Sequence, residues 1–276
     1  MGTLILLALI TGGWNISVDA GLNLTQSYYN DAWQGDETGA ITWTAITNMS
    51  FSKLLSEKFE FSDVAQLAYG QTYSQNSETK KWNPPQKSTD KIENEGVLKF
   101  TMGWLVDPFV SLRLESQFMD DANDLYVNPM TFTEAFGLAR TILKREKAEM
   151  NSRLGLAFKE TFDRAEGAEN PTEGGLELVI DGKKVLSKIA KYEGKLRIFK
   201  ALYNSKADEL PNDNWKAVDF DFQNTVSMSL SKYIQLNLLL ELVYDKDLVD
   251  IVQVKENFAI GLSYNCLLYT SDAADE

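Results

Sequence analysis

The chain contains no histidine among its 276 residues and has a single cysteine. The lack of histidine excludes Ser–His and Cys–His catalysis, and it also excludes zinc or haem sites with histidine ligands. No stretch reaches the roughly 18 consecutive apolar residues that a membrane-spanning helix needs. We therefore expect a protein that is not an enzyme and that holds no cofactor and no metal. Any passage through a membrane must be made by strands.

Positive charge is also scarce, since 27 lysines and arginines face 40 aspartates and glutamates and leave a net charge of −13. Nucleic-acid binding needs a basic face, so no nucleic-acid partner is expected. The chain also has no glycine-rich motif that would bind a phosphate group. Its paired glycines, Gly12-Gly13 and Gly174-Gly175, are interpreted as residues of turns or strand edges.

Both ends of the chain look different from the rest. Residues 266–276 resemble the translated end of a sequencing adapter, and the only cysteine, Cys266, lies in them. We interpret this segment as a non-native tail. Residues 1–13 contain a short apolar run, which is either the remnant of a secretion signal or a frayed lead-in to the first strand. Residues 14–265 are predicted to form one domain.

The dominant pattern in residues 14–265 is the alternation of apolar and polar residues, which is typical of β-strands. In the first predicted strand Trp14, Ile16, Val18, Ala20, Leu22 and Leu24 share one face. Similar alternation predicts strands near 40–54, 58–73, 91–104, 108–119, 218–228, 234–242 and 252–264.

The middle of the chain has a weaker pattern. Residues 134–162 and 183–203 are rich in Ala, Glu, Lys, Arg and Leu, which favour helices. Alternating apolar residues near 150–158 and 192–198 nevertheless fit strands. We predict strands in this region, and a helical insertion remains the alternative.

The predicted connections fall into two length classes. Short turns are expected near 55–58, 105–108, 144–149, 181–184 and 231–232, and long polar loops near 28–39, 74–90, 120–130, 163–174, 204–214 and 245–251. Short turns at one rim and long loops at the other are typical of outer-membrane barrels. The sequence therefore predicts an all-β fold, a closed antiparallel up-and-down transmembrane barrel of about twelve strands (about 10 to 14). Both termini then lie at the short-turn rim.

Alternation alone does not say which face points outward, and a two-sheet sandwich also alternates. A barrel of about twelve strands encloses a lumen too wide for its own side chains to fill. An apolar lining would leave a large void there, whereas a polar lining lets water fill the lumen. We therefore expect the apolar row to face lipid and the polar row to face the lumen. Asp63 and Glu256 fall in the apolar row as exceptions, and a β-bulge at Asp63 would relieve the first.

Charged residues of the polar row are candidates for lining the lumen. They are Asp19, Glu93, Glu95, Lys99, Arg113, Glu115, Asp219, Asp221, Glu241 and Lys255. Such mixed charges can leave an aqueous, weakly cation-preferring pore, or they can pair with one another and plug it. If Trp104 lies opposite Val110, then Lys99 lies opposite Glu115, and we predict an ion pair between them.

One loop and one motif stand out. The loop at 74–90 carries Lys80, Lys81, Trp82 and Lys87 and could contact a sugar or a headgroup phosphate, although a solvated loop explains the same residues. The first loop reads Tyr28-Tyr29-Asn30-Asp31-Ala32-Trp33-Gln34-Gly35-Asp36-Glu37-Thr38 after an alternating strand.

This first loop, with Trp33, Gly35, Asp36 and Glu37, resembles that of a family of bacterial outer-membrane β-barrels whose function is unknown. A second block fits the same family, Ser88-Thr89-Asp90-Lys91-Ile92-Glu93 followed by Glu115-Ser116-Gln117-Phe118. The resemblance covers residues 14–160. It implies a bacterial outer-membrane location, the lipid bilayer and the outer-membrane insertion machinery as partners, and no mechanism.

Two functions remain open for such a barrel. The first is a passive, porin-like channel or transport-related pore for small polar solutes. The second is a non-conducting barrel with a structural or surface-binding role. A barrel enzyme acting on lipid is disfavoured because the chain has no histidine. The oligomeric state cannot be predicted from the sequence.

Overall fold

In a computed structural model, the chain is described over residues 13–29, 38–210, 212–247 and 249–269, with side chains described up to residue 262. The long strands are β1 (Asn15–Ser27), β2 (Ala40–Leu54), β3 (Phe59–Ser74), β4 (Gln86–Phe100), β5 (Asp107–Ser116), β8 (Met130–Arg145), β9 (Ala148–Phe162), β10 (Thr172–Val185), β11 (Ala190–Asn204), β12 (Val218–Ser229), β13 (Ile234–Asp245) and β14 (Val249–Tyr269). Two short strands, β6 (Met119–Asp120) and β7 (Leu125–Tyr126), and the 3₁₀ turn η1 (Asn214–Lys216) lie in connections.

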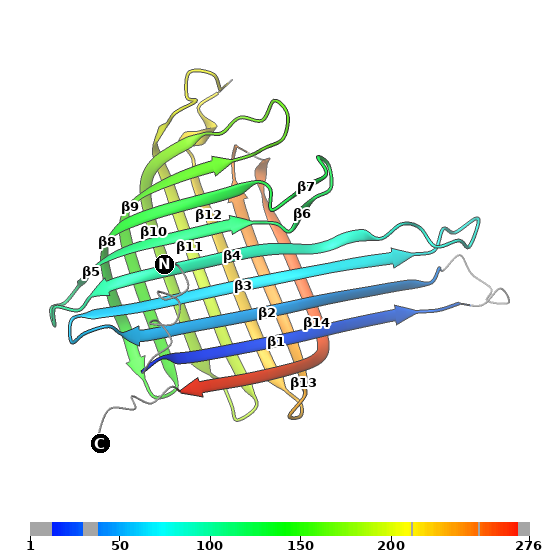
Figure 1. Cartoon of the computed structure of the whole chain (residues 1–276), viewed down its shortest axis with the longest axis horizontal. Coiled ribbons are helices and arrows are strands. Elements are labelled where there is room, and N and C mark those ends of the chain that lie inside the picture. Colours follow the sequence, from blue (N-terminus) through cyan, green and yellow to red (C-terminus); the bar gives the residue numbers. More distant parts are fainter. Residues whose placement is uncertain (1–12, 30–37, 211, 248, 270–276) are drawn as a thin grey trace, which may run out of the picture.

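The twelve long strands close into one antiparallel barrel, in the order β1-β14-β13-β12-β11-β10-β9-β8-β5-β4-β3-β2 (Figure 1). The closing pair is β1 with β14, where Asn15 lies opposite Tyr269. The start of β1 and the end of β14 therefore share one rim. The predicted closed barrel of about twelve strands is confirmed.

The middle of the chain is also strand. Residues 130–162 form β8 and β9, and residues 172–204 form β10 and β11, so the alternative of a helical insertion is wrong. Along β9 the residues Leu154 and Leu156 are exposed while Arg153 and Ala157 are buried. This alternation, together with a neighbouring strand on each side, outweighs the helix preference of the Ala, Glu and Lys residues.

The two rims differ as expected in the length of their connections. Residues 55–58, 101–106, 146–147, 186–189 and 230–233 form the short-turn rim. The described residues of the longer connections at the other rim, the long-loop rim, are 28–29, 38–39, 75–85, 117–129, 163–171, 205–210 and 212–217. Two predictions fail here. The connection between β13 and β14 spans only residues 246–248, and the turn expected at 181–184 lies at 186–189 because β10 continues to Val185.

Strands β1 to β4 run beyond their neighbours at the long-loop rim. The pairing of β1 with β14 stops at Asn23, and the pairing of β4 with β5 stops at Ile92, whereas β2 and β3 stay paired as far as Ala40 and Ser74. Figure 1 shows this four-stranded extension reaching away from the barrel body. It leaves a notch where β5 ends and β4 continues.

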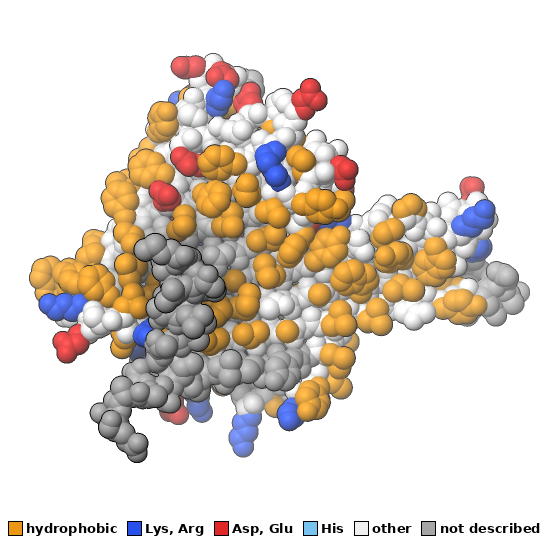
Figure 2. All heavy atoms as spheres, in the orientation of Figure 1, with side chains coloured by type: hydrophobic (Ala, Val, Ile, Leu, Met, Phe, Trp, Pro, Cys, Tyr) orange, Lys and Arg blue, Asp and Glu red, His pale blue; other side chains and the backbone are white. Residues whose placement is uncertain are grey.

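The outer wall is apolar. Outward side chains such as Leu112 (50% exposed), Phe136 (50%) and Leu154 (55%) have no covering in the fold. Hydrophobic side chains spread across the visible wall in Figure 2, and most charged ones lie towards its edges. Among the described residues, no helix is long and apolar enough to cross a membrane.

Asp63 lies in this outward row without a bulge. Its register with Phe51 and Gly96 is regular, and the irregularity between β3 and β4 falls at Gly70/Gln71 instead, so no bulge relieves Asp63. The Asn94 side-chain amide donates a hydrogen bond of 2.9 Å to the Asp63 carboxylate. Gly96 leaves room beside it, because a Cβ there would lie 3.3 Å from a carboxylate oxygen of Asp63. A polar partner and a small neighbour accommodate the charge. Glu256 also falls in the outward row, opposite Leu240, and is exposed.

The two unusual ends lie partly outside the described residues. Residues 266–269 form the end of β14 and pair with residues 15–18 of β1. Residues 1–12 and 270–276 are not described. A single domain over residues 14–265, with a foreign tail after it, stays a prediction.

Candidate functional site

Strand β4 carries two buried carboxylates on its inner face. Glu93 is 4% exposed and Glu95 is 6% exposed. Both face the interior because the outward positions of β4 alternate with them and pair with exposed apolar residues of β5, such as Gly96 with Leu112 and Leu98 with Val110. Buried carboxylates need partners, because desolvation of an unpaired charge costs several kcal/mol.

The partners come from the opposite wall of the barrel. Lys195 of β11 lies 2.8 Å from a carboxylate oxygen of Glu95 and 3.3 Å from one of Glu93. Arg197 of the same strand donates to Glu93. In the closed order β4 and β11 are separated by β5, β8, β9 and β10, so these contacts cross the interior.

Charged side chains of the strands between β4 and β11 join the same group of ion pairs. Arg153 of β9 donates to Glu95 at 2.7 Å. Arg113 of β5 donates to Glu177 of β10 at 2.6 Å, and its guanidinium lies 3.8 Å from Glu95. Arg113, Arg153 and Glu177 are all 6–8% exposed. We call the set Glu93, Glu95, Arg113, Arg153, Glu177, Lys195 and Arg197 the trans-barrel network.

Arg197 also resolves a local conflict. Strand register places Glu93 directly opposite Glu115, two like charges that would repel. The Arg197 guanidinium bridges them, since it donates to Glu93 and, over 3.1 Å, to Glu115. It reaches Asp221 of β12 as well, at 3.4 Å. Removal of this one cation would leave three carboxylates close together.

An apolar cluster fills the space beside the network. Phe109 of β5 packs with Ala135 and Ala139 of β8 and with Ala157 of β9, and all four are nearly inaccessible. Gly137 adds to this closeness, because a Cβ there would lie 2.2 Å from the Leu154 carbonyl oxygen. Small residues on β8 and β9 therefore let side chains from other strands fill this half of the interior.

The inner face of β3 is less crowded at Val64. Val64 of β3 shares the inner face with Glu95, its register partner, and is 42% exposed. Water-sized space therefore lies beside Val64 on the inner face of β3. The interior is packed and charged around the trans-barrel network and more open beside Val64.

Strand register places all ten predicted lumen residues on the inner face. Asp19 shares its face, through Asn48 and Gln66, with Glu93. Glu93, Glu95 and Arg113 belong to the trans-barrel network, and Glu115 and Asp221 contact it through Arg197. Asp219 lies opposite Phe199 and outside the network. Lys255 of β14 lies 3.7 Å from Glu241 on the neighbouring strand β13. The motif residues Trp33, Gly35, Asp36 and Glu37 lie outside the described residues.

The predicted ion pair between Lys99 and Glu115 is wrong. Leu98, and not Trp104, lies opposite Val110, so Lys99 faces Phe109 across the β4–β5 pair. Residues 101–106 form the turn and shift the register from the one expected. Lys99 pairs instead with Glu60 of β3, at 2.7 Å.

Sequence reasoning missed Glu177, Lys195 and Arg197. Lys195 and Arg197 lie in residues 183–203, where the alternation is weak and a helix was the alternative, and Glu177 lies in β10, for which no clear alternation was identified. A signal was present, since Lys195 and Arg197 are two residues apart, as Glu93 and Glu95 are, and would share one face of a strand.

The chemistry of the network is electrostatic. Within the described residues, no group of three or more Asp, Glu or Cys side chains is arranged to hold a metal ion. Each carboxylate of the trans-barrel network is matched by guanidinium or ammonium groups, so the network can brace opposite walls and narrow the passage between them.

Comparisons with known proteins find one family model and several solved structures that resemble this chain. Residues 24–121 match the family described as "Protein of unknown function (DUF3078)", which confirms the resemblance to a family without assigned activity. No curated protein matches the sequence.

Among solved structures, an outer-membrane channel from Pseudomonas putida F1 is 14% identical with a TM-score of 0.45, and the match covers 94% of this chain and 97% of that one. The translocator domain of the autotransporter NalP from Neisseria meningitidis is 8% identical with a TM-score of 0.36 and coverages of 95% and 92%. The outer-membrane channel DcaP of Acinetobacter baumannii is 7% identical with a TM-score of 0.36 and coverages of 92% and 96%.

Proposed function

We propose that this chain is an integral outer-membrane β-barrel whose resting interior is closed to free diffusion, and whose long-loop rim is its working surface. The proposal keeps the lipid bilayer and the insertion machinery as partners. It assigns no catalytic role to the chain. It favours the non-conducting alternative over an open pore.

One observation carries the proposal, the contact of Lys195 and Arg197 on β11 with Glu93 and Glu95 on β4. A solute that passed between these strands would have to separate charges that are buried and matched. Breaking a buried ion pair by removing one partner costs about 3–5 kcal/mol. A hydrated solute cannot replace all the ion pairs that its passage would break, so its passage would carry this free-energy cost.

The outer wall supports the membrane part of the proposal. Exposed rows of Leu, Val and Phe need an apolar solvent, and in lipid a closed barrel satisfies its backbone hydrogen bonds through its own strands. The two rims, with short turns on one side and long loops on the other, suit a barrel that has one periplasmic and one external end.

Single-channel recording in planar bilayers tests the proposal. The refolded chain should stay silent, while a variant with Glu93, Glu95, Lys195 and Arg197 all changed to Ser should conduct, because small side chains no longer bridge the interior. A second variant, with the same four residues changed to Gln, fills more of the interior than the Ser variant and should conduct less than it does. Heat-shifted gel mobility confirms that each barrel is folded.

The matched control removes an exposed ion pair. Lys206 and Glu209 pair at 2.9 Å in the loop 205–217, so K206S/E209S should leave the barrel silent. Steady conductance of the unmodified chain, at the size of an open pore, would overturn the closed state.

A narrow channel is the second candidate function. The exposed inward side chain of Val64 supports it, because that exposure leaves space beside the inner face of β3. In this case the unmodified chain would conduct small cations weakly, and widening the β1–β3 side would raise the conductance more than removing the network.

A further inference from the structure

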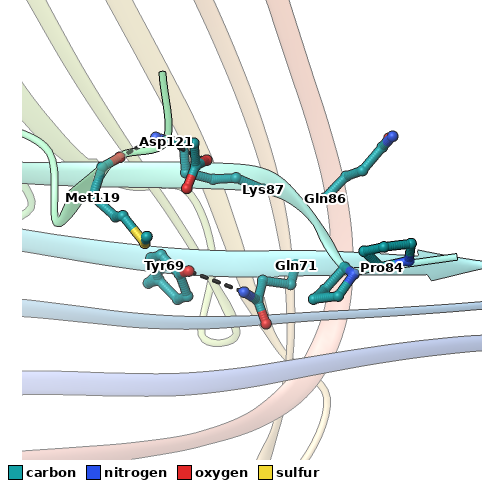
Figure 3. Close-up of a pocket in the computed structure, with 8 residues that line it drawn as sticks. Tyr69, Gln71, Pro84, Gln86, Lys87, Met119 and Asp121 are labelled. Carbon is teal, nitrogen blue, oxygen red and sulfur yellow. Dashed lines mark hydrogen bonds and ion pairs between the residues drawn. The ribbon is translucent and has the colours of Figure 1, made fainter. Parts of the chain in front are cut away.

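A pocket of about 640 Å³ lies at the notch where β5 ends and the β1–β4 extension begins. Figure 3 shows its lining, with Tyr69 and Gln71 on β3, Pro84 in the connection before β4, Gln86 at the start of β4, and Met119 and Asp121 in the loop 117–129. Its size falls within the range of small-molecule sites, about 300–1,000 Å³. Nothing in the trans-barrel network contributes to it.

The floor of the pocket is rigid. The Tyr69 ring is fixed between Trp43, at a centroid distance of 5.9 Å, and Phe118, also at 5.9 Å and edge-on. The Gln71 side-chain amide donates to the Tyr69 hydroxyl at 3.0 Å. Aromatic rings held in this way present a fixed apolar surface to a ligand.

The loop wall is fixed as well. The Asp90 carboxylate accepts hydrogen bonds from the backbone N–H groups of Phe118 (2.6 Å) and Met119 (3.1 Å). Lys87 adds contacts to Gln117 and to the Met119 carbonyl. The loop 117–129 is therefore anchored to β4 beside the pocket.

A β-bulge aims Lys87 towards this wall. Gly70 pairs with Thr89 while Gln71 pairs with Lys87, so Ser88 is the extra residue. Bulges often redirect a side chain near a functional site. Gly70 is required there, because a Cβ would lie 2.6 Å from the Thr44 hydroxyl oxygen and 2.7 Å from the Trp43 carbonyl oxygen.

The charges of the pocket select against anions. The Lys87 ammonium lies 3.0 Å from Asp90 and 3.7 Å from Asp121, so two carboxylates accompany one cation. A phosphate would meet a net negative environment and a lysine whose hydrogen bonds are already made. This excludes Lys87 from the phosphate contact that the sequence suggested for the loop.

The remaining groups suit an uncharged ring with an apolar face and a hydroxylated edge. Tyr69, Pro84 and Pro85 offer flat apolar surfaces, and Gln86 can donate and accept hydrogen bonds. The Gln71 amide already donates to Tyr69 and accepts from Tyr73 at 3.4 Å, which leaves one N–H and one oxygen lone pair for a ligand. The Asp121 carboxylate is 55% exposed and can accept from hydroxyls. We infer that this pocket binds a neutral sugar unit, either free or as part of a glycolipid. The inference rests on the proposed role of the long-loop rim as the working surface.

Saturation-transfer NMR on the refolded full chain in detergent tests the site. The probes are neutral hexose oligosaccharides, the same sugars carrying phosphate, and vesicles with and without a neutral glycolipid. The neutral oligosaccharide should bind, and the phosphorylated sugar should bind more weakly. Binding to glycolipid vesicles but not to free sugar assigns the source as membrane-linked.

Variants locate the binding. Gln71→Ala and Gln86→Ala should each weaken binding about five-fold, the effect of one lost hydrogen bond. Asp121→Asn should weaken it less, because an amide oxygen still accepts. Asp124→Asn, in the same loop but outside the pocket lining, is the matched control and should change nothing.

Three results would overturn the inference. They are no binding of any neutral probe, tighter binding of the phosphorylated sugars, and binding that Q71A and Q86A leave unchanged. Each of these results is distinguishable from a failure of the proposed closed state. A folded, non-conducting barrel that binds no sugar would contradict only the sugar site and would leave the closed interior supported.

Discussion

Arg197 on β11 donates a hydrogen bond to Glu93 on β4, although 104 residues of chain separate them and four strands stand between them in the barrel wall. Both side chains are almost fully buried. The contact therefore links opposite walls through the interior, and the stability of the barrel should depend on it.

A double-mutant cycle measures this dependence. Arg197→Gln should lower the free energy of unfolding by about 3 kcal/mol or more, because it leaves Glu93, Glu115 and Asp221 without their shared cation. The double variant E93Q/R197Q should lose less than the sum of the singles, with a coupling of about 1–3 kcal/mol. Urea unfolding in lipid vesicles checks it. The exposed loop pair K206Q/E209Q should show a coupling of about 0.5 kcal/mol at most.

The ion pair between Lys99 and Glu60 should be weak. Its side chains are 25% and 39% exposed, so water screens the interaction. Lys99→Gln should therefore change the free energy of unfolding by less than about 1 kcal/mol. A change as large as that of Arg197→Gln would place Lys99 in a buried contact and contradict the observed register.

Gly137 should tolerate no side chain. A Cβ would lie 2.2 Å from the Leu154 carbonyl oxygen, a backbone atom that cannot move without breaking the β8–β9 pairing. Gly137→Ala should destabilise the barrel by about 3 kcal/mol or prevent folding. Gly21→Ala is the matched control on another strand, because its Cβ would lie 3.6 Å from the nearest atom, an ordinary contact. Equal folding yields for the two variants would show that β8 and β9 are not so close.

The loop 117–129 should respond to acid through Asp120. Hydrogen bonds from the side chains of Asn123 and Asn128 hold the pKa of Asp120 below its ordinary value. A lowered pKa in the folded state means that the stabilisation is fully present above the unfolded-state pKa and is lost as pH falls through the folded-state pKa. The titration of the Asp120 carboxyl carbon, followed by NMR, should therefore have a midpoint below that of an ordinary aspartate.

Asn128 is the hub of that loop and gives a companion test. It is fully buried, donates to Asp120 and Asp163, and accepts from the backbone N–H of Arg164. Asn128→Ala should raise the Asp120 pKa and speed proteolysis within residues 117–129, with no change in heat-shifted gel mobility. Unchanged proteolysis would mean that other contacts hold the loop.

The barrel itself was accessible from the sequence because strand alternation is a local property. Clear alternation, as at Val110, Leu112 and Leu114, predicted the strands and their outward face. The weaker middle strands have the same inner and outer rows. Their inner positions are occupied by Ala and Gly as well as by charges, as at Gly155 and Ala157, so the contrast between the two rows is small.

The site was less accessible because its partners meet only through closure. Glu93 and Glu95 were identified as inner residues, but their cations sit on a strand that no local pattern connects to β4. The Lys99 prediction failed for a related reason. The register of β4 with β5 depends on where the turn between them lies. The sequence suggested a turn at 105–108, whereas the turn spans residues 101–106, and this difference shifts every residue of β4 relative to its partner on β5.

Chemical crosslinking across the interior is the most direct test of the central claim. With Cys266 changed to Ser, cysteines at positions 95 and 195 should be joined by a short bismaleimide in the folded barrel, because the native side chains there lie 2.8 Å apart at their charged ends. A crosslinked band within a single chain is expected, with no such band for either single cysteine. A folded barrel in which positions 95 and 195 react separately and never join would show an open lumen and contradict the account.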